Sequence, residues 1–430
     1  MNTVWQWSCP TRVVAGAGGL EHVVDEQRQG GRRIGVVVDA GVEATPAVRW
    51  LREQWAGWPL LALEPVGVSV ADVGALAGWL REQAAATGLD TVVAVGGGSL
   101  LDLVKLATAA VGDASLPARL SAGRCGVVGL PPSIARRPGS TTGPRRILVP
   151  TTVGTGSEVS AVACTRVRGA NRLVTGEALR PEIAVLDPAA TGGLPAAMIA
   201  EGVLEALLRV LGPMIGSAEA RPVPDAAALA LAGELVRLGD RLAERRGDLT
   251  GEAAAAAEAV AAAEAAAGDD RLRASELSAY THTSWALAGR DPFGGRAWYI
   301  ANEVATVLGV RKMPATMPVV AAVWARAAAG DRRFGHPERL APAWDAVRRA
   351  ARPGLGGDPA AGIRRLATRW AVADCPPATP AQLTAIAGRT VRAFGGGLPP
   401  LASITHADVV ALLRESLPVA VDARLAAVAS

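Results

Sequence analysis

Glu205 and Arg209 are the first residues whose types and spacing suggest chemistry. They are the only charged side chains in the apolar stretch GVLEALLRVLG, residues 202–212, and their i, i+4 spacing places them on one face of a helix. A helix that is apolar nearly all round is normally buried, and buried charges are costly unless they are paired. The pair is therefore either a structural salt bridge or a functional group, since a fixed guanidinium can bind a carboxylate or polarise a carbonyl.

A glycine loop offers a second kind of chemistry. In VVAVGGGSLLDLVK, a β-branched run leads into Gly96, Gly97 and Gly98 and then into a helical pattern. The backbone N–H groups of such a loop can approach a phosphate closely, and the helix dipole favours its negative charge. Ser99 and Asp102 also fit an N-cap serine followed by an acid three residues later. The usual G-x-G-x-x-G fingerprint is missing from the first strand-to-helix turn.

Two more polar groups follow predicted strands. Asp39 ends the run RRIGVVVD, where it is either an ordinary turn residue or an acceptor for ribose hydroxyls that repels a 2′-phosphate. Thr151, Thr152 and Thr155 lie in VPTTVGTGSE, after another apolar run, and their hydroxyls suit a diphosphate or an amide. Ligands of open α/β sheets bind at the carboxyl ends of the strands. These residues and the glycine loop are therefore expected at one edge of the sheet, where they could hold a ligand, and Asp39 would favour NAD over NADP if it has the ribose role.

The elements that position these residues alternate in the first half of the chain. Strand patterns such as GVVVD and TVVAV are separated by helical patterns such as VADVGALAGWLREQAAATG. This alternation predicts a Rossmann-like, doubly wound parallel sheet. From about Pro195 onward only helical patterns rich in Ala, Leu and Arg follow. We therefore predict an α/β domain at residues 1–194 and an all-helical domain at residues 195–430.

Composition excludes several classes of protein. The chain of 430 residues has a formal net charge of only +4, which gives no indication of a nucleic-acid partner. No basic segment followed by an apolar run begins the chain, and Glu258 and Glu264 interrupt an Ala-rich stretch, so we expect neither a signal peptide nor a membrane span. Scattered cysteines without a CxxC pair indicate free thiols and a cytoplasmic protein: Cys9, Cys125, Cys164 and Cys375.

Three ordered motifs carry a resemblance to a known family. GGGSLLDLVK, VPTTVGTGSE and PEIAVLDP, together with both ends of the chain, resemble the iron-containing alcohol dehydrogenase family, within the superfamily that includes dehydroquinate synthase. The resemblance implies an N-terminal NAD(P)-binding domain, a helical C-terminal domain, an active site in the cleft between them and a homo-oligomer. It also implies roles for individual residues: Asp39 at the adenosine ribose, residues 96–99 at the diphosphate, Asp102 near the nicotinamide, Thr151, Thr152 and Thr155 at the middle of the cofactor, and Arg172 at a ribose.

The same resemblance points to a degraded metal site. Family members hold a divalent metal such as iron or zinc with one Asp and three His, the first two in a pattern like G-x-D-A-L-x-H. Here Glu205 stands at the Asp position and Arg209 at the first His position, while His282 and Asn302 stand at the other two. Arginine stays protonated and cannot ligate a cation. The chain has only four histidines, so three histidine ligands are hard to assemble, although Glu205, His282 and a third oxygen ligand could hold a metal weakly.

These observations lead to one functional hypothesis and two alternatives. We expect an NAD(P)-dependent oxidoreductase that transfers hydride between nicotinamide and a small or peptide-borne alcohol or carbonyl. In it the guanidinium of Arg209 takes the place of the metal, pairs with Glu205 and suits a carboxylate-bearing substrate, and His282 is either a general base or structural. Family members also serve in specialised pathways such as daptide-type peptide tailoring. The alternatives are a non-catalytic nucleotide-binding or scaffold subunit and a dehydroquinate-synthase-like cyclase.

Overall fold

A computed structural model of the chain describes residues 7–54, 57–64, 67–123, 125–131, 143–248 and 257–420. The chain divides into two compact units. The sheet unit comprises Ser8–Gly202 and Gly251–Thr283, and the helical unit comprises Met1–Trp7, Val203–Thr250 and Ser284–Ser430. The division at residue 194 stays a prediction, and α8 (Ala257–Thr283) groups with the sheet unit.

Six parallel strands form the main sheet of the sheet unit, in the order β1-β9-β6-β4-β2-β3. The strands are β1 (Arg12–Ala15), β2 (Ile34–Asp39), β3 (Leu60–Leu63), β4 (Thr91–Gly96), β6 (Arg145–Pro150) and β9 (Ile183–Leu186). The central strands are nearly continuous β-branched and apolar runs, which is typical of strands covered on both faces. The predicted doubly wound parallel sheet is confirmed.

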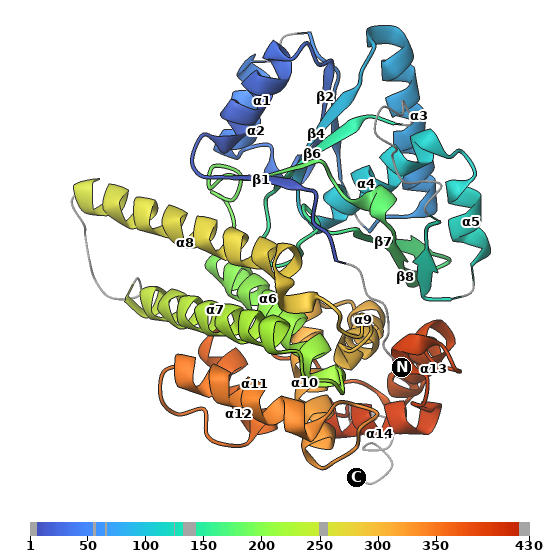
Figure 1. Ribbon diagram of the computed structural model, residues 1–430, viewed down its shortest axis with the longest axis vertical. Coiled ribbons are helices and arrows are strands. Elements are labelled where there is room, and N and C mark those ends of the chain that lie inside the picture. The colour runs from blue at the N-terminus through green and yellow to red at the C-terminus, as the bar shows by residue number, and fades with distance from the viewer. Residues whose placement is uncertain are drawn as a thin grey trace, which may run out of the picture. The chain divides into compact units, whose positions relative to one another are not determined.

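Helices cover both faces of this sheet (Figure 1). α1 (Gly19–Gln29) and α2 (Pro46–Gln54) pack on one face, where Val36 and Val93 join their buried cluster. α3 (Val70–Thr87), α4 (Gly98–Gly112) and α5 (Leu116–Ala122) share the other cluster with Val37 and Val92. Because successive strand residues point to opposite faces, each central strand contributes to both cores.

A second sheet of three strands lies in the same unit, in the order β5-β8-β7. β5 (Val127–Gly129) is parallel to β8 (Ala170–Thr175), and β7 (Val162–Val167) is antiparallel to β8. The turn between β7 and β8 consists of Arg168 and Gly169, whose φ values are +50° and +76°. Positive φ at both positions is typical of the tight type I′ hairpin turn.

Long helices follow the sheet, as predicted. They are α6 (Ala196–Gly216), α7 (Pro222–Asp248), α8 (Ala257–Thr283), α9 (Arg296–Leu308), α10 (Lys312–Ala328), α11 (Pro337–Ala350), α12 (Pro359–Arg369), α13 (Pro380–Phe394) and α14 (His406–Ser416). α6 begins in the sheet unit and ends in the helical unit, whereas α8 lies in the sheet unit, where Ala279 is buried against Val159 and Ala184. None of the helices in the described ranges combines the length and the apolar character needed to cross a bilayer.

Candidate functional site

The carboxyl ends of β2, β4 and β6 bring three of the predicted motifs together. Gly96 at the end of β4 is paired in register with Pro150 at the end of β6. A Cβ atom added to Gly96 would lie 3.0 Å from the Cβ of Asp39, which ends β2. Asp39, the glycine loop and the threonine loop therefore meet at one edge of the sheet, as their positions after strands predicted.

The glycine loop opens α4 without a side-chain cap. Our prediction that Ser99 is the N-cap is wrong, because α4 begins at Gly98 and its N-cap is Gly97, for which the structure shows no side-chain cap hydrogen bond. Ser99 lies one residue inside the first turn. The first N–H groups of the helix are thus left for another acceptor, which is the arrangement that binds phosphate at a helix N-terminus.

The threonine loop packs directly against the glycine loop. A Cβ at Gly98 would lie 2.8 Å from Cγ2 of Thr155, and a Cβ at Gly97 would lie 3.5 Å from Thr152. The hydroxyl oxygen of Thr151 is buried and has no hydrogen-bond partner among the described residues. Buried hydroxyls are normally hydrogen-bonded, so an orphaned one beside a glycine loop fits a polar ligand such as a dinucleotide.

A second glycine contact supports the threonine loop. Gly154 has a φ of +99°, and a Cβ there would lie 2.4 Å from Cα of Gly202 in the first part of α6. A Cβ at Gly202 would in turn lie 2.4 Å from the carbonyl oxygen of Val153. The backbone of the threonine loop therefore packs directly against the backbone of α6, and neither glycine position leaves room for a side chain.

Asp39 serves the turn that follows β2. Its Oδ1 accepts a hydrogen bond of 2.9 Å from the backbone N–H of Gly41. This is the ordinary turn role that we set beside the ribose role. An ionised carboxylate has two oxygens with about four acceptor sites in total, so the turn hydrogen bond occupies only one of them.

Asp102 belongs to a buried network that the sequence analysis missed. Its Oδ1 accepts from the Ser157 hydroxyl at 2.5 Å and lies 3.1 Å from the Lys105 ammonium, and its Oδ2 accepts from the backbone N–H of Cys164 at 2.8 Å. Lys105 also donates to the carbonyl oxygens of Ser157, at 2.9 Å, and Val162. Burial lowers the pKa of the Lys105 ammonium, against the opposing effect of Asp102. The network joins α4 to the threonine loop and to β7.

Arg172 lies on β8, in the smaller sheet. Its guanidinium donates a hydrogen bond of 3.0 Å to the carbonyl oxygen of Gly123, at the end of α5. The side chain therefore ties β8 to that helix. Its contact with a ribose stays a prediction.

In the helical unit, Glu205 is shared by two cations. The Arg209 guanidinium lies 3.5 Å from Glu205 Oε1, and the Lys312 ammonium donates a hydrogen bond to the same oxygen. Lys312 also lies over the ring of Trp298, with 5.6 Å between Nζ and the ring centroid. Lys312 could not be predicted from the sequence, because no pattern links a lysine at the start of α10 to a glutamate in α6.

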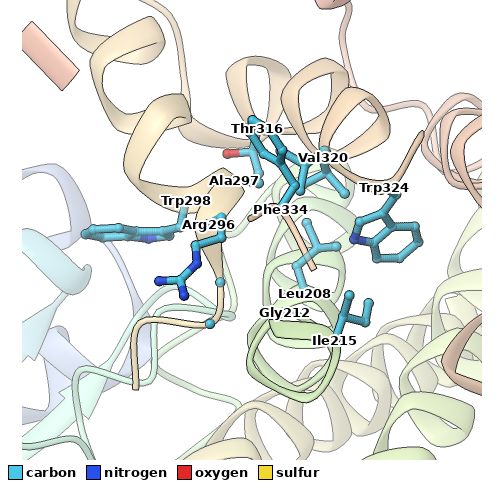
Figure 2. Close-up of a pocket in the computed structure, with 13 residues that line it drawn as sticks. Leu208, Gly212, Ile215, Arg296, Ala297, Trp298, Thr316, Val320, Trp324 and Phe334 are labelled. Carbon is cyan, nitrogen blue, oxygen red and sulfur yellow. The ribbon is translucent and has the colours of Figure 1, made fainter. Parts of the chain in front are cut away.

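A cavity of about 50 Å³ lies beside this cluster in the helical unit (Figure 2). Its walls come from α6, α9, α10 and two loop segments, and they include Leu208, Ile215, Trp298, Thr316, Trp324 and Phe334. Arg296 also lines it, but its guanidinium is occupied by Asp291 Oδ2 at 3.0 Å and by three backbone carbonyl oxygens, at 2.7 to 3.2 Å. The cavity is therefore mainly apolar.

The residues expected at a metal site do not fit a metal. Glu205 is already paired with the Lys312 ammonium and the Arg209 guanidinium, and the positive charges of these two groups repel an incoming divalent cation. His282 lies in the last turn of α8 in the sheet unit, and Asn302 lies in α9 of the helical unit. Within the described ranges, no group of three or more His, Cys, Asp and Glu side chains is placed to hold a metal ion.

Parts of the chain are similar to known proteins. The family model for iron-containing alcohol dehydrogenase matches residues 10–188. The probable alcohol dehydrogenase EutG of Salmonella typhimurium is 30% identical over 254 residues, which cover 56% of this chain and 58% of that protein. Phosphonoacetaldehyde reductase of Streptomyces viridochromogenes is 32% identical over 186 residues, which cover 41% of this chain and 42% of that protein. The chain thus spans about half the length of these curated relatives.

A solved structure extends the comparison over nearly the whole chain. Sulfoacetaldehyde reductase from Bifidobacterium kashiwanohense, in complex with NAD+, matches with a TM-score of 0.70 and 17% identity, over 96% of this chain and 99% of that one. At this identity the match shows a shared fold. Residues 10–188 therefore match the iron-containing alcohol dehydrogenase family, and nearly the whole chain shares the fold of the sulfoacetaldehyde reductase.

Proposed function

We propose that this protein is an oxidoreductase that transfers hydride between NAD(H) and an alcohol or carbonyl group. The observation that carries the proposal is the edge of the main sheet, where Asp39, the uncapped start of α4 and the orphaned Thr151 hydroxyl lie together. The match of residues 10–188 to the iron-containing alcohol dehydrogenase family supports the same reaction. Asp39 favours NAD over NADP, because its carboxylate suits ribose hydroxyls and repels a 2′-phosphate.

Each part of this edge suits one part of the dinucleotide. Residues 96–99 would hold the diphosphate with backbone N–H groups, and Thr151, Thr152 and Thr155 would hold the middle of the cofactor with hydroxyls. When bound, the nicotinamide supplies or accepts the hydride. Lys105 holds Asp102 and the threonine loop in register with α4, which keeps the nicotinamide side of the site rigid.

On the substrate side, we propose that a fixed cation performs the task that a metal performs in members of that family. Arg209 is always protonated and gives charge-assisted hydrogen bonds to a carbonyl oxygen or a carboxylate. His282 is the candidate general base for the hydroxyl proton. Two relatives are named for acidic aldehydes, phosphonoacetaldehyde and sulfoacetaldehyde, which supports a substrate with an acidic group. Service in a daptide-type peptide-tailoring pathway stays a prediction.

Calorimetric titration with NADH tests the proposal. We expect wild-type protein to bind NADH and the Asp39→Ala variant to bind at least about tenfold more weakly, because a hydrogen bond to a charged group contributes about 1.5–3 kcal/mol. The matched control is Asp25→Ala, which removes an exposed acid of α1 that pairs with Arg28. NADH consumption with acidic and neutral aldehydes then tests turnover. Absence of binding at millimolar NADH would leave the non-catalytic scaffold as the function.

A further inference from the structure

Lys312 occupies an unusual setting at the first residue of α10. Its ammonium donates one hydrogen bond, to Glu205 Oε1, and lies above the face of the Trp298 ring. The side chain is 36% exposed, so it is held in place without being sealed from ligands. An ammonium has three N–H donors. Lys312 therefore keeps donor capacity for an acceptor from outside the protein.

Glu205 holds the Lys312 ammonium in place, but it is shared with a second cation. The same oxygen that accepts from Lys312 lies 3.5 Å from the Arg209 guanidinium. These three side chains, one carboxylate and two cations, together carry one net positive charge in the cluster formed by Glu205, Arg209 and Lys312. Such charge favours an anion and repels a metal ion.

The cavity adjoins this cluster along two helices. Leu208 follows Glu205 by three residues in α6, and Thr316 follows Lys312 by four residues in α10, so each wall residue lies one helical turn beyond a charged one. Trp298 belongs to both features, since it lines the cavity and packs against the Lys312 ammonium. In Figure 2, Trp298 lies on one side of the cavity, and Ile215 and Trp324 lie on the other.

We propose that Lys312 binds the acidic group of the substrate and thereby determines specificity for carbonyl or alcohol compounds that bear a carboxylate, phosphonate or sulfonate. A short apolar part of the substrate enters the adjoining cavity, whose 50 Å³ admits only a small group. Glu205 and Trp298 orient the ammonium, and Arg209 adds positive charge beside it. This inference rests on the proposed oxidoreductase function, because only that function makes the bound anion a substrate. The binding of the anion itself depends on Lys312.

Calorimetry with phosphonoacetate, an unreactive dianion, tests the site in the full-length protein without any nucleotide. We expect the wild type to bind, Lys312→Met to bind at least about tenfold more weakly, and Lys312→Arg to retain part of the affinity. Glu205→Gln should bind at least about threefold more tightly, because it removes the competing carboxylate and leaves both cations. Arg332→Met is the control, since it removes an exposed arginine that pairs with Glu338 in the same unit.

The Glu205→Gln variant separates this proposal from its competitors. A metal site would lose its ligand in that variant, and a purely structural salt bridge would give no gain in phosphonoacetate affinity. Unchanged binding by Lys312→Met, or weaker binding by Glu205→Gln with an intact far-ultraviolet circular dichroism spectrum, would overturn the proposal. Phosphonoacetate binding without any NADH binding would overturn the oxidoreductase function and leave the anion site standing. Where turnover is measured, Lys312→Met should lower kcat/KM for acidic aldehydes at least about tenfold and spare neutral ones.

Discussion

The ammonium of Lys105 is fully buried, yet it is well supplied with acceptors. It meets the carboxylate of Asp102 and the carbonyl oxygens of Ser157 and Val162. Burial of a charge is costly, and this cost lowers the pKa of the group. The arrangement persists because one side chain joins α4, the threonine loop and β7. Lys105 is therefore a positioning residue for the edge of the sheet at which we propose that the nucleotide binds.

Substitution of Lys105 tests that role. We expect Lys105→Met to lower the free energy of unfolding by about 3 kcal/mol, because it leaves the largely buried Asp102 carboxylate without its cation. Urea unfolding measures the change, and NADH titration of the folded variant should show weaker binding. Arg28→Met is the control, because it breaks an exposed ion pair with Asp25 and should have no measurable effect. Equal stability of the two variants would contradict the role of Lys105.

Residue-level prediction from the sequence succeeded where neighbours along the chain define the contact. The pairing of Glu205 with Arg209 follows from their spacing on one helix. Lys312 could not be found in this way, since it reaches Glu205 from a separate helix, 107 residues further along the chain. The Ser99 cap failed because Gly98 already has helical backbone geometry, so the helix begins one residue before the serine.

At the scale of elements, the start of α6 is defined by its contact with the threonine loop. Gly202 approaches Gly154 so closely that an added Cβ at either position would overlap backbone atoms. A backbone clash cannot be relieved by rotating a side chain. The position of the loop that carries Thr151 and Thr155 therefore depends on the absence of a Cβ in α6.

Gly202→Ala tests this dependence. We expect the variant to lose about 1–3 kcal/mol of unfolding free energy, as overpacked sites do, and to bind NADH at least about fivefold more weakly because the loop must move. Urea unfolding and NADH calorimetry measure both effects. Gly74→Ala in α3 is the matched control, because its added Cβ would have no described atom within 4 Å apart from its chain neighbours and the backbone of its own helix, and it should be neutral or slightly stabilising. Wild-type behaviour of Gly202→Ala would show that the loop adapts freely.

The turn of the β7–β8 hairpin could not be predicted from the sequence. Its turn places Arg168 at a φ of +50° in front of Gly169. Hairpin turns of this kind are normally signalled by Asn-Gly or Asp-Gly, and Arg-Gly does not give that signal. The central strands were predictable for the opposite reason, because β2 and β4 are buried, β-branched runs that end in polar or glycine residues.

At the scale of the whole molecule, the sequence predicted that helices follow the sheet, but it did not predict which unit α8 belongs to. That helix is rich in alanine on every side, so its pattern does not show which neighbour it packs against. Its contacts place it with the sheet, where Ala279 packs among Val159, Ala184 and Leu186. Helical pattern alone therefore predicts the element and leaves its unit undetermined.

Metal binding is a property of the whole protein that can be measured directly. We expect treatment with EDTA to leave Tm, NADH binding and any turnover unchanged, and added Fe2+ or Zn2+ to give no rise in Tm. A ligand present at 100 times its Kd would stabilise the folded state by about 2.7 kcal/mol, so a bound metal would be visible in a thermal melt. Stoichiometric metal in the purified protein, with a rise in Tm that Glu205→Gln abolishes, would contradict this expectation.

The paired glycines also bear on how this scaffold can be re-engineered. At Gly154 and Gly202 no partner residue can shrink to make room for a larger one, so compensating double substitutions are closed to random libraries. The walls of the cavity, by contrast, are side chains such as Leu208, Ile215 and Thr316, which can be exchanged for others of different volume. Libraries that seek new substrates should therefore keep the glycine pair fixed and diversify those walls.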